Sequence, residues 1–181
     1  MIDPYGLFRD PEEAQPPRQC DLDRLHQWGV SAHGMSSPVP ILVSNVLFDG
    51  RGGYSPYRVG EFAYVIPIIE DCEIIDFAAW DFRSNRIATR IGLGSCLGQE
   101  QIGVGGAGTT GLALPVWRNP LGWLLAERKG LIIADRELAA HLVSGLCLKA
   151  EDREHAAELR RVLRVRSPSI CAPSSRRAVA A

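Results

Sequence analysis

Lysine is almost absent from this chain of 181 residues, since it occurs only at Lys129 and Lys149 and arginine supplies the other basic side chains. The 20 basic side chains face 21 acidic ones, which gives a formal net charge of −1. A chain with so little net charge is not expected to coat nucleic acid or membranes with its whole surface. We attribute the preference for arginine to genomic base composition.

Long apolar runs are missing as well. No stretch approaches the ~20 residues that a membrane-spanning helix needs, and Glu70, Asp71 and Glu73 interrupt the longest one. The first residues include Asp3 and Pro4 and lack the basic and apolar segments of a signal peptide. The sequence therefore predicts a soluble, cytoplasmic protein with no membrane partner.

Paired cysteine motifs are also absent. The five cysteines are widely separated and form no C-x-x-C, which favours reduced thiols over a disulfide framework. Cys20, His26 and His33 have the chemistry of metal ligands, but three such widely spaced side chains are a weak metal site. We expect neither a metal nor a cofactor.

Residues 61–91 contain a dense run of β-branched and aromatic side chains, the composition of a pleated, buried surface. Apolar segments at 62–69 and 72–81 and an alternating segment at 86–91 predict a β-meander. Both faces of 62–69 are apolar, which predicts a strand covered on both sides. Pro67 instead favours a sheet edge or a bulge, because proline cannot donate a backbone hydrogen bond. In 86–91, we expect Ile87, Thr89 and Ile91 to point inward.

Turn and capping signals define the other elements. Asn119 followed by Pro120 predicts a helix start, and Gly130 predicts its stop, with Arg128 and Lys129 complementing the helix dipole. Asp135 is placed to cap a further helix. Helices are expected at 21–28, 120–129, 136–143 and 151–164, other strands at 41–48, 112–117, 131–134 and 169–172, and loops at 31–40 and 54–60.

This order of elements predicts an α+β fold, or a mixed α/β sheet, in which an N-terminal antiparallel β-meander is packed by three to four C-terminal helices. We expect one globular domain over 20–172. The proline- and charge-rich segment 1–19 and the tail 173–181 are predicted to be disordered.

Glycine is concentrated in 92–111, where little regular structure is expected. Residues 103–108 match G-x-G-x-x-G, but no helix begins there, so we interpret them as a loop. Residues 94–98 have the G-x-C-x-G spacing of a nucleophile elbow with cysteine in place of serine. Cys96 is thus a candidate nucleophile with His141 or His155 as its base, although a small residue in a glycine-rich turn gives the same pattern.

Two acids, Asp76 and Asp81, lie within an apolar strand. If residues 82–85 form a hairpin loop, Asp81 faces Arg86, and a cross-strand ion pair explains it. Asp76 has no such partner, so we expect it either to be buried with hydrogen-bond partners or to open onto a pocket. A metal-dependent phosphodiesterase built on both acids would need a third acid and a nearby lysine, which are not evident.

The C-terminal helix ends with a basic group that could meet the phosphates of a nucleic acid, made up of Arg160, Arg161, Arg164 and Arg166. A solvated helix end that complements the dipole is the alternative.

The chain resembles small proteins, of unknown activity, from alphaproteobacterial prophages and other mobile elements. The resemblance rests on the strand at 76–81, the helix start at 119–124 and the helix with His155. The resemblance implies a setting and no reaction, and it assigns no functional residue. Our leading hypothesis is a non-enzymatic accessory or binding protein with a nucleic-acid or protein partner, linked to the nucleic-acid metabolism of a mobile element. The alternative is a thiol-dependent hydrolase or transferase that uses Cys96 with His141 or His155.

Overall fold

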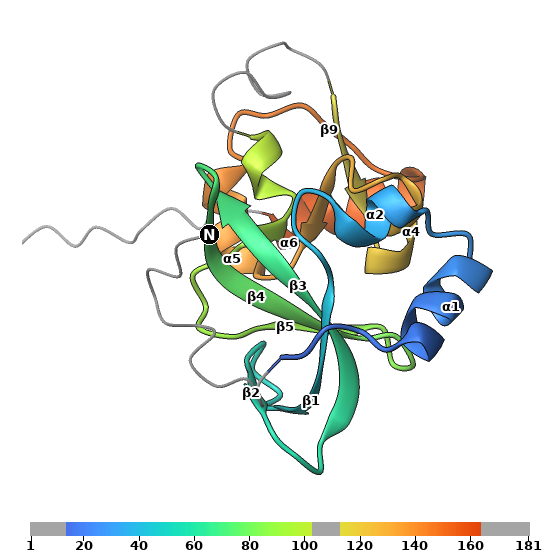
Figure 1. Ribbon diagram of the computed structural model, residues 1–181. Coiled ribbons are helices and arrows are strands. Elements are labelled where there is room, and N and C mark those ends of the chain that lie inside the picture. Colours follow the sequence, from blue (N-terminus) through green and yellow to red (C-terminus); the bar gives the residue numbers. More distant parts are fainter. Residues whose placement is uncertain (1–13, 103–112, 164–181) are drawn as a thin grey trace, which may run out of the picture.

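Five antiparallel strands form the larger of two sheets in the computed structural model, which describes residues 14–102 and 113–163 (Figure 1). Across the sheet, the strands are β2 (Tyr54–Pro56), β1 (Leu42–Phe48), β3 (Glu61–Glu70), β4 (Glu73–Asp81) and β5 (Arg86–Thr89). Strands β3, β4 and β5 are the predicted meander. The α+β class is therefore confirmed.

The sheet curls until its two edges touch. Thr89 of β5 pairs with Gly53, just before β2, and the Thr89 N–H donates to the Gly52 carbonyl at 2.8 Å. One face encloses an apolar cluster inside the curl, which contains Val46, Tyr54, Ala63, Val65, Ile69, Ile74, Phe77, Ala79 and Ala88. Because edge strands with unpaired backbone groups attract other chains, this contact also protects part of the sheet edge.

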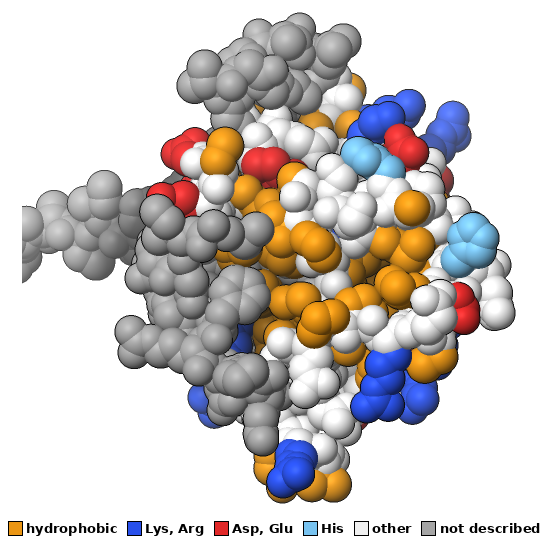
Figure 2. Space-filling view, viewed as in Figure 1, with side chains coloured by type: hydrophobic (Ala, Val, Ile, Leu, Met, Phe, Trp, Pro, Cys, Tyr) orange, Lys and Arg blue, Asp and Glu red, His pale blue; other side chains and the backbone are white. Residues whose placement is uncertain are grey.

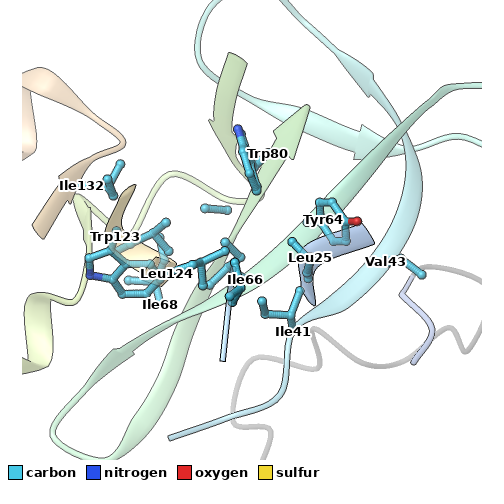
Figure 3. Packing of buried hydrophobic residues seen from close by; sticks show 13 residues of the cluster. Leu25, Ile41, Val43, Tyr64, Ile66, Ile68, Trp80, Trp123, Leu124 and Ile132 are labelled. Atoms are coloured by element: carbon cyan, nitrogen blue, oxygen red, sulfur yellow. The ribbon is translucent and has the colours of Figure 1, made fainter. Parts of the chain in front are cut away.

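The outer face of the sheet packs against helices α1 (Gln19–Gln27), α2 (Ala32–Ser36) and α4 (Pro120–Leu125). Figure 3 shows side chains of the sheet, such as Ile66 and Trp80, together with Leu25, Trp123 and Leu124 of the helices. Strand β3 is thus buried on both faces, as its sequence predicts.

The second sheet is small and mixed. Its order is β6 (Cys96–Leu97), β8 (Leu131–Ile133), β7 (Leu114–Trp117) and β9 (Leu148–Lys149), and β7 runs parallel to both β8 and β9. The 3-10 turn η1 (Gln99–Gln101) follows β6. Helices α5 (Arg136–Leu142) and α6 (Arg153–Val162) contribute Ala139, Leu142 and Leu159 to a third apolar cluster with this sheet.

The surroundings of Pro67 agree with both predictions for this strand, burial on both faces and an edge or bulge at the proline. The pairing of β1 with β3 starts at Leu42 and Val65, so Pro67 lies beyond the end of β1. A register shift between Ile68 and Ile69 follows directly. The strand is paired on both sides up to Val65 and has an edge where the proline lacks its donor.

Several predicted boundaries are wrong. The expected loop 31–40 contains α2, which Ser31 caps by accepting the Gly34 N–H at 3.1 Å, and the expected connection 54–60 contains β2. Of the inward set predicted for 86–91, Thr89 is buried and Ile87 packs against the outer-face cluster, but Ile91 lies beyond β5 and is 45% exposed, and Ala88 is buried on the other face. Strand β9 was not predicted, since two residues carry no periodicity.

Helix α4 ends earlier than predicted, at Leu125. Glu127 and Arg128 adopt positive φ angles of 54° and 61°, which are incompatible with a continuing helix. The predicted caps of this helix and the next are confirmed, since Asn119 accepts the Gly122 N–H and Asp135 those of Glu137 and Leu138, all at 2.9 Å.

Residues 14–19, which the sequence assigns to a disordered segment, include Gln15, and this residue pairs with Val43 of β1. The predicted strand 169–172, the tail 173–181 and the G-x-G-x-x-G segment lie outside the described residues. Among the described helices, none is both long and apolar enough to cross a bilayer.

Candidate functional site

The carboxylate of Asp76 is completely buried and fully hydrogen-bonded. Its two oxygens accept backbone N–H groups at 2.7 to 3.1 Å from Phe77, Arg90, Ile91, Leu93 and Gly94. Of the two alternatives that the sequence leaves open, burial with partners is the one observed. Asp76 therefore fixes the segment after β5 against β4, and its oxygens are not directed into a pocket.

Gly94 allows this close packing. A Cβ atom at this position would lie 2.3 Å from Cδ1 of Ile68 and 3.1 Å from Cβ of Asp76. The glycine that suggested a nucleophile elbow is thus explained by the approach of the backbone to β3 and β4.

Asp81 is opposite Arg86 in the strand register, as predicted, but the predicted ion pair between them is wrong. The guanidinium of Arg86 instead pairs with Glu61, while Asp81 accepts the Arg83 N–H at 3.0 Å and the Ser84 hydroxyl at 2.5 Å. Burial acts to raise the pKa of Asp81, yet these hydrogen bonds, helped by the charge of Arg86, leave that pKa below its usual range. Asp81 stabilises the β4–β5 hairpin.

Cys96 lies in β6 with no exposed surface, packed in the third apolar cluster. Burial raises the pKa of its thiol to about 12. A nucleophilic cysteine needs a thiolate, and this thiol stays protonated at neutral pH. The turn around it is held by Gln99, whose side-chain oxygen accepts the N–H groups of Ser95 and Cys96 at 3.1 and 3.3 Å.

The two candidate bases lie on other elements. His141 is exposed in the last turn of α5, whereas His155 is buried in the first turn of α6. Nδ1 of His155 accepts the Glu151 N–H at 3.3 Å. Among the hydrogen bonds of residues 14–102 and 113–163, none joins either histidine to Cys96, so the predicted thiol–imidazole pair is not assembled.

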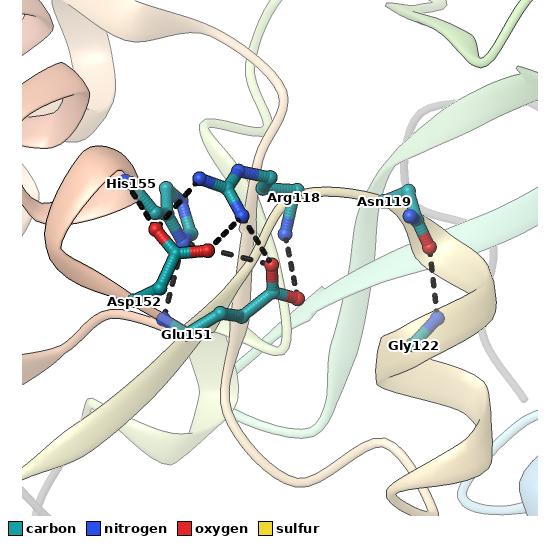
Figure 4. Close-up of polar contacts among 6 residues, drawn as sticks. All are labelled: Arg118, Asn119, Gly122, Glu151, Asp152 and His155. Atoms are coloured by element: carbon teal, nitrogen blue, oxygen red, sulfur yellow. Dashed lines mark hydrogen bonds and ion pairs between the residues drawn. The ribbon is translucent and has the colours of Figure 1, made fainter.

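A polar network joins the turn before α4 to the start of α6 (Figure 4). Arg118 donates to Asp152 at 2.5 and 2.9 Å and to Glu151 at 3.4 Å, and Asp152 caps α6 by accepting the His155 N–H at 2.8 Å. The guanidinium of Arg118 holds the pKa of Asp152 well below its usual range. The network brings together two of the three segments on which the resemblance to prophage proteins rests, and its contacts have a structural role.

A hollow of about 590 Å³ lies beside the start of α1, and we call it the α1 hollow. It lies between residues 15–21, strands β1 and β3 and the loop after β2. Its lining consists of Gln15, Pro16, Arg18, Cys20, Asp21, Val43, Ser44, Asn45, Pro56, Tyr57, Arg58 and Phe62. Sequence reasoning missed this site, because its residues come from three segments with no common motif.

Basic charge predominates in the α1 hollow. Arg18 and Arg58 are exposed and form no ion pair with any residue that the structure describes. Asp21, the one acid of the described lining, is buried, accepts the Arg18 N–H at 3.2 Å and pairs with Arg24 at 3.6 Å. The positive N-terminal end of the α1 dipole adds to the attraction for an anion.

The loop that carries Tyr57 and Arg58 is held by Asn45 of β1. The Tyr57 N–H donates to the Asn45 carbonyl at 2.9 Å, and the Asn45 amide donates to the Arg58 carbonyl at 3.3 Å. Gly60 closes the loop, where a Cβ atom would lie 2.3 Å from the Val46 carbonyl oxygen. Two side chains of the hollow are therefore placed by a fixed backbone.

Two further groups of predicted site residues are the metal candidates and the basic end of the last helix. In the part of the chain that the structure describes, no three His, Cys, Asp or Glu side chains are placed to hold a metal ion, Cys20, His26 and His33 included. Arg160 and Arg161 are exposed at the end of α6, and Arg164 and Arg166 lie outside the described residues. Figure 2 shows basic groups at the periphery of one face of the molecule, around a middle where hydrophobic side chains are visible.

The chain was compared with known protein families, proteins and structures. The chain matches no family model, no curated protein and no solved structure. The resemblance to small prophage proteins stays a prediction.

Proposed function

We propose that this chain is a non-enzymatic binding protein that serves the nucleic-acid metabolism of a mobile element and holds a phosphate-bearing ligand in the α1 hollow. The observation that supports this proposal is the convergence of Arg18 and Arg58 on one cavity without acidic ion-pair partners among the described residues. Arginine suits phosphate because its planar guanidinium donates two parallel hydrogen bonds.

The size and polar lining of the hollow agree with a binding role. A volume of about 590 Å³ falls within the range of roughly 300–1,000 Å³ that ligand pockets occupy. Amide groups of Gln15 and Asn45 lie in the same lining and offer both donors and acceptors. The carboxylate of Asp76 and the thiol of Cys96, in contrast, are buried and engaged in packing or hydrogen bonds, which supports binding over catalysis.

The end of α6 is a second surface for phosphate contacts. Arg160 and Arg161 are exposed there, but Glu154 and Glu158 share the same short helix. Its charge is therefore mixed, and we place the main contacts in the α1 hollow.

The test is fluorescence anisotropy with labelled oligonucleotides over a range of salt concentrations. We expect binding that weakens steeply with salt, and a double variant Arg18→Ala, Arg58→Ala with lower affinity and a salt slope reduced by about 0.7 to 0.9 for each lost phosphate contact. The matched control is Arg160→Ala, Arg161→Ala, which removes the same charge from α6.

If only the α6 variant weakens binding, the ligand lies at the helix end and the hollow is excluded. If no oligonucleotide binds at low salt, the link to nucleic acid is lost. The alternative thiol enzyme predicts selective alkylation of Cys96 at neutral pH, and the burial of that thiol does not favour it.

A further inference from the structure

We infer that the ligand of the α1 hollow is single-stranded nucleic acid, and that one base stacks on Tyr57 while the neighbouring phosphates contact Arg18 and Arg58. This inference rests on the proposed function and specifies its ligand. Its structural basis is the presence of exposed aromatic and basic side chains in one cavity lining.

Tyr57 has the exposure and the support that a stacking platform needs. Its side chain is 53% exposed, and it belongs to none of the apolar clusters of the described residues. The backbone on both sides is fixed, since its N–H donates to Asn45 at 2.9 Å and its carbonyl accepts the Gly60 N–H at 2.7 Å. Because the backbone is already fixed, only the side-chain torsions of Tyr57 lose freedom when a base covers the ring.

Aromatic rings and guanidinium groups continue from the hollow along the outer face of the sheet. Phe62, which lines the hollow, lies under Arg24 with 5.9 Å between the guanidinium carbon and the ring centre. Phe82 follows, with Arg24 at 5.2 Å and Arg83 at 5.5 Å from its ring centre. Proteins bind single strands without reading their sequence by combining aromatic platforms with basic groups. Here Phe62 and Phe82 are half-buried and already covered by the guanidinium groups, so they place basic charge beside the hollow, and Tyr57 is the platform.

A duplex fits this surface less well. In a duplex the bases stack on one another, so their faces are not available to a tyrosine ring. Proteins that read duplex DNA insert a protruding helix or β-ribbon into a groove, whereas the α1 hollow is concave. The concave, arginine-lined shape with an aromatic side chain in its lining therefore favours an unpaired strand.

The experiment compares labelled oligothymidylate and oligouridylate of about 12 nucleotides, within known site sizes for single strands, with a duplex of the same length. We expect both single strands to bind at least tenfold more tightly than the duplex. Tyr57→Leu should weaken single-strand binding about tenfold without changing the salt slope, because stacking releases no counterions. Tyr57→Phe keeps the ring and should retain the affinity.

Val59→Ala is the matched control, since Val59 is in the same loop, is 84% exposed and is absent from the described lining of the hollow. Equal binding of single strand and duplex, or full affinity of Tyr57→Leu with reduced affinity of Arg58→Ala, overturns the stacking inference and leaves the proposed function standing. A complete lack of oligonucleotide binding overturns both. Circular dichroism of Tyr57→Leu confirms that the variant is folded.

Discussion

A carboxylate that is removed from water is stable only when its oxygens have partners, and Asp76 illustrates this requirement. The sequence identified it as an acid in an apolar strand and predicted either buried hydrogen bonds or a pocket. It did not identify the partners, because they are backbone N–H groups, four of them from residues 90–94, and leave no side-chain signal. For Asp81 the register was predictable, but the nearer Ser84 hydroxyl and Arg83 N–H take the place of the expected Arg86 contact.

Replacing Asp76 with asparagine tests the structural role of this carboxylate. The amide group would present N–H donors to backbone N–H groups, so two or more buried donors would lose their acceptor. We expect Asp76→Asn to lower the free energy of unfolding by about 3 kcal/mol in urea denaturation. Asp23→Asn is the control, because Asp23 is exposed and accepts one bond from Gln19. Similar losses for both variants would contradict the structural role of Asp76.

At the scale of the elements, the end of α4 is where sequence rules gave the wrong answer. Arg128 was expected to complement a helix dipole, but it is buried and donates to the carbonyls of Gly34, Met35 and Val39 at 2.7 to 3.0 Å. Burial lowers the pKa of Arg128 to about 10. Local signals cannot reveal this role, because the three acceptors lie about ninety positions earlier in the chain, around α2.

Arg128→Lys tests whether this side chain joins α4 to α2. Lysine keeps the positive charge, but its single ammonium group cannot match the three directions of the guanidinium. We expect the free energy of unfolding to fall by about 2 to 3 kcal/mol, from the hydrogen bonds lost by buried carbonyls. Arg153→Lys, an exposed substitution of the same kind at the start of α6, should change it by less than about 0.5 kcal/mol. Equal effects would show that the contacts of Arg128 are not needed.

For the molecule as a whole, composition and periodicity sufficed for the meander, its two buried faces and the α+β class. They did not predict that the sheet closes between Gly53 and Thr89 or that a second sheet forms from strands of two to four residues. Strands β7 and β8 fall within the predicted strands 112–117 and 131–134, but β6 and β9, of two residues each, are defined by their partners and not by a pattern of their own. The α1 hollow was missed for the same reason, since it exists only after distant segments pack together.

Cys96 reports on the integrity of the second sheet, because its thiol is buried only when β6, β8 and the adjacent helices are assembled. Burial raises its pKa from 9.0 to about 12, so the folded state keeps a proton that the unfolded chain loses above pH 9.0. The free energy of unfolding should therefore be unaffected below pH 9.0 and then fall by about 1.4 kcal/mol per pH unit until about pH 12.

The contribution of Cys96 is isolated by comparing variants at neutral pH and at about pH 10 in urea denaturation. Cys96→Ala should lose less stability between the two conditions than the unsubstituted chain, by roughly 1.4 kcal/mol. Cys72→Ala should behave like the unsubstituted chain, because Cys72 is exposed in the β3–β4 turn and is solvated in both states. The same burial predicts that alkylating reagents modify Cys20, Cys72 and Cys147 in the folded protein and reach Cys96 only on unfolding. Rapid modification of Cys96 in the folded protein would contradict this arrangement, and it would favour the thiol-dependent enzyme over the binding protein proposed above.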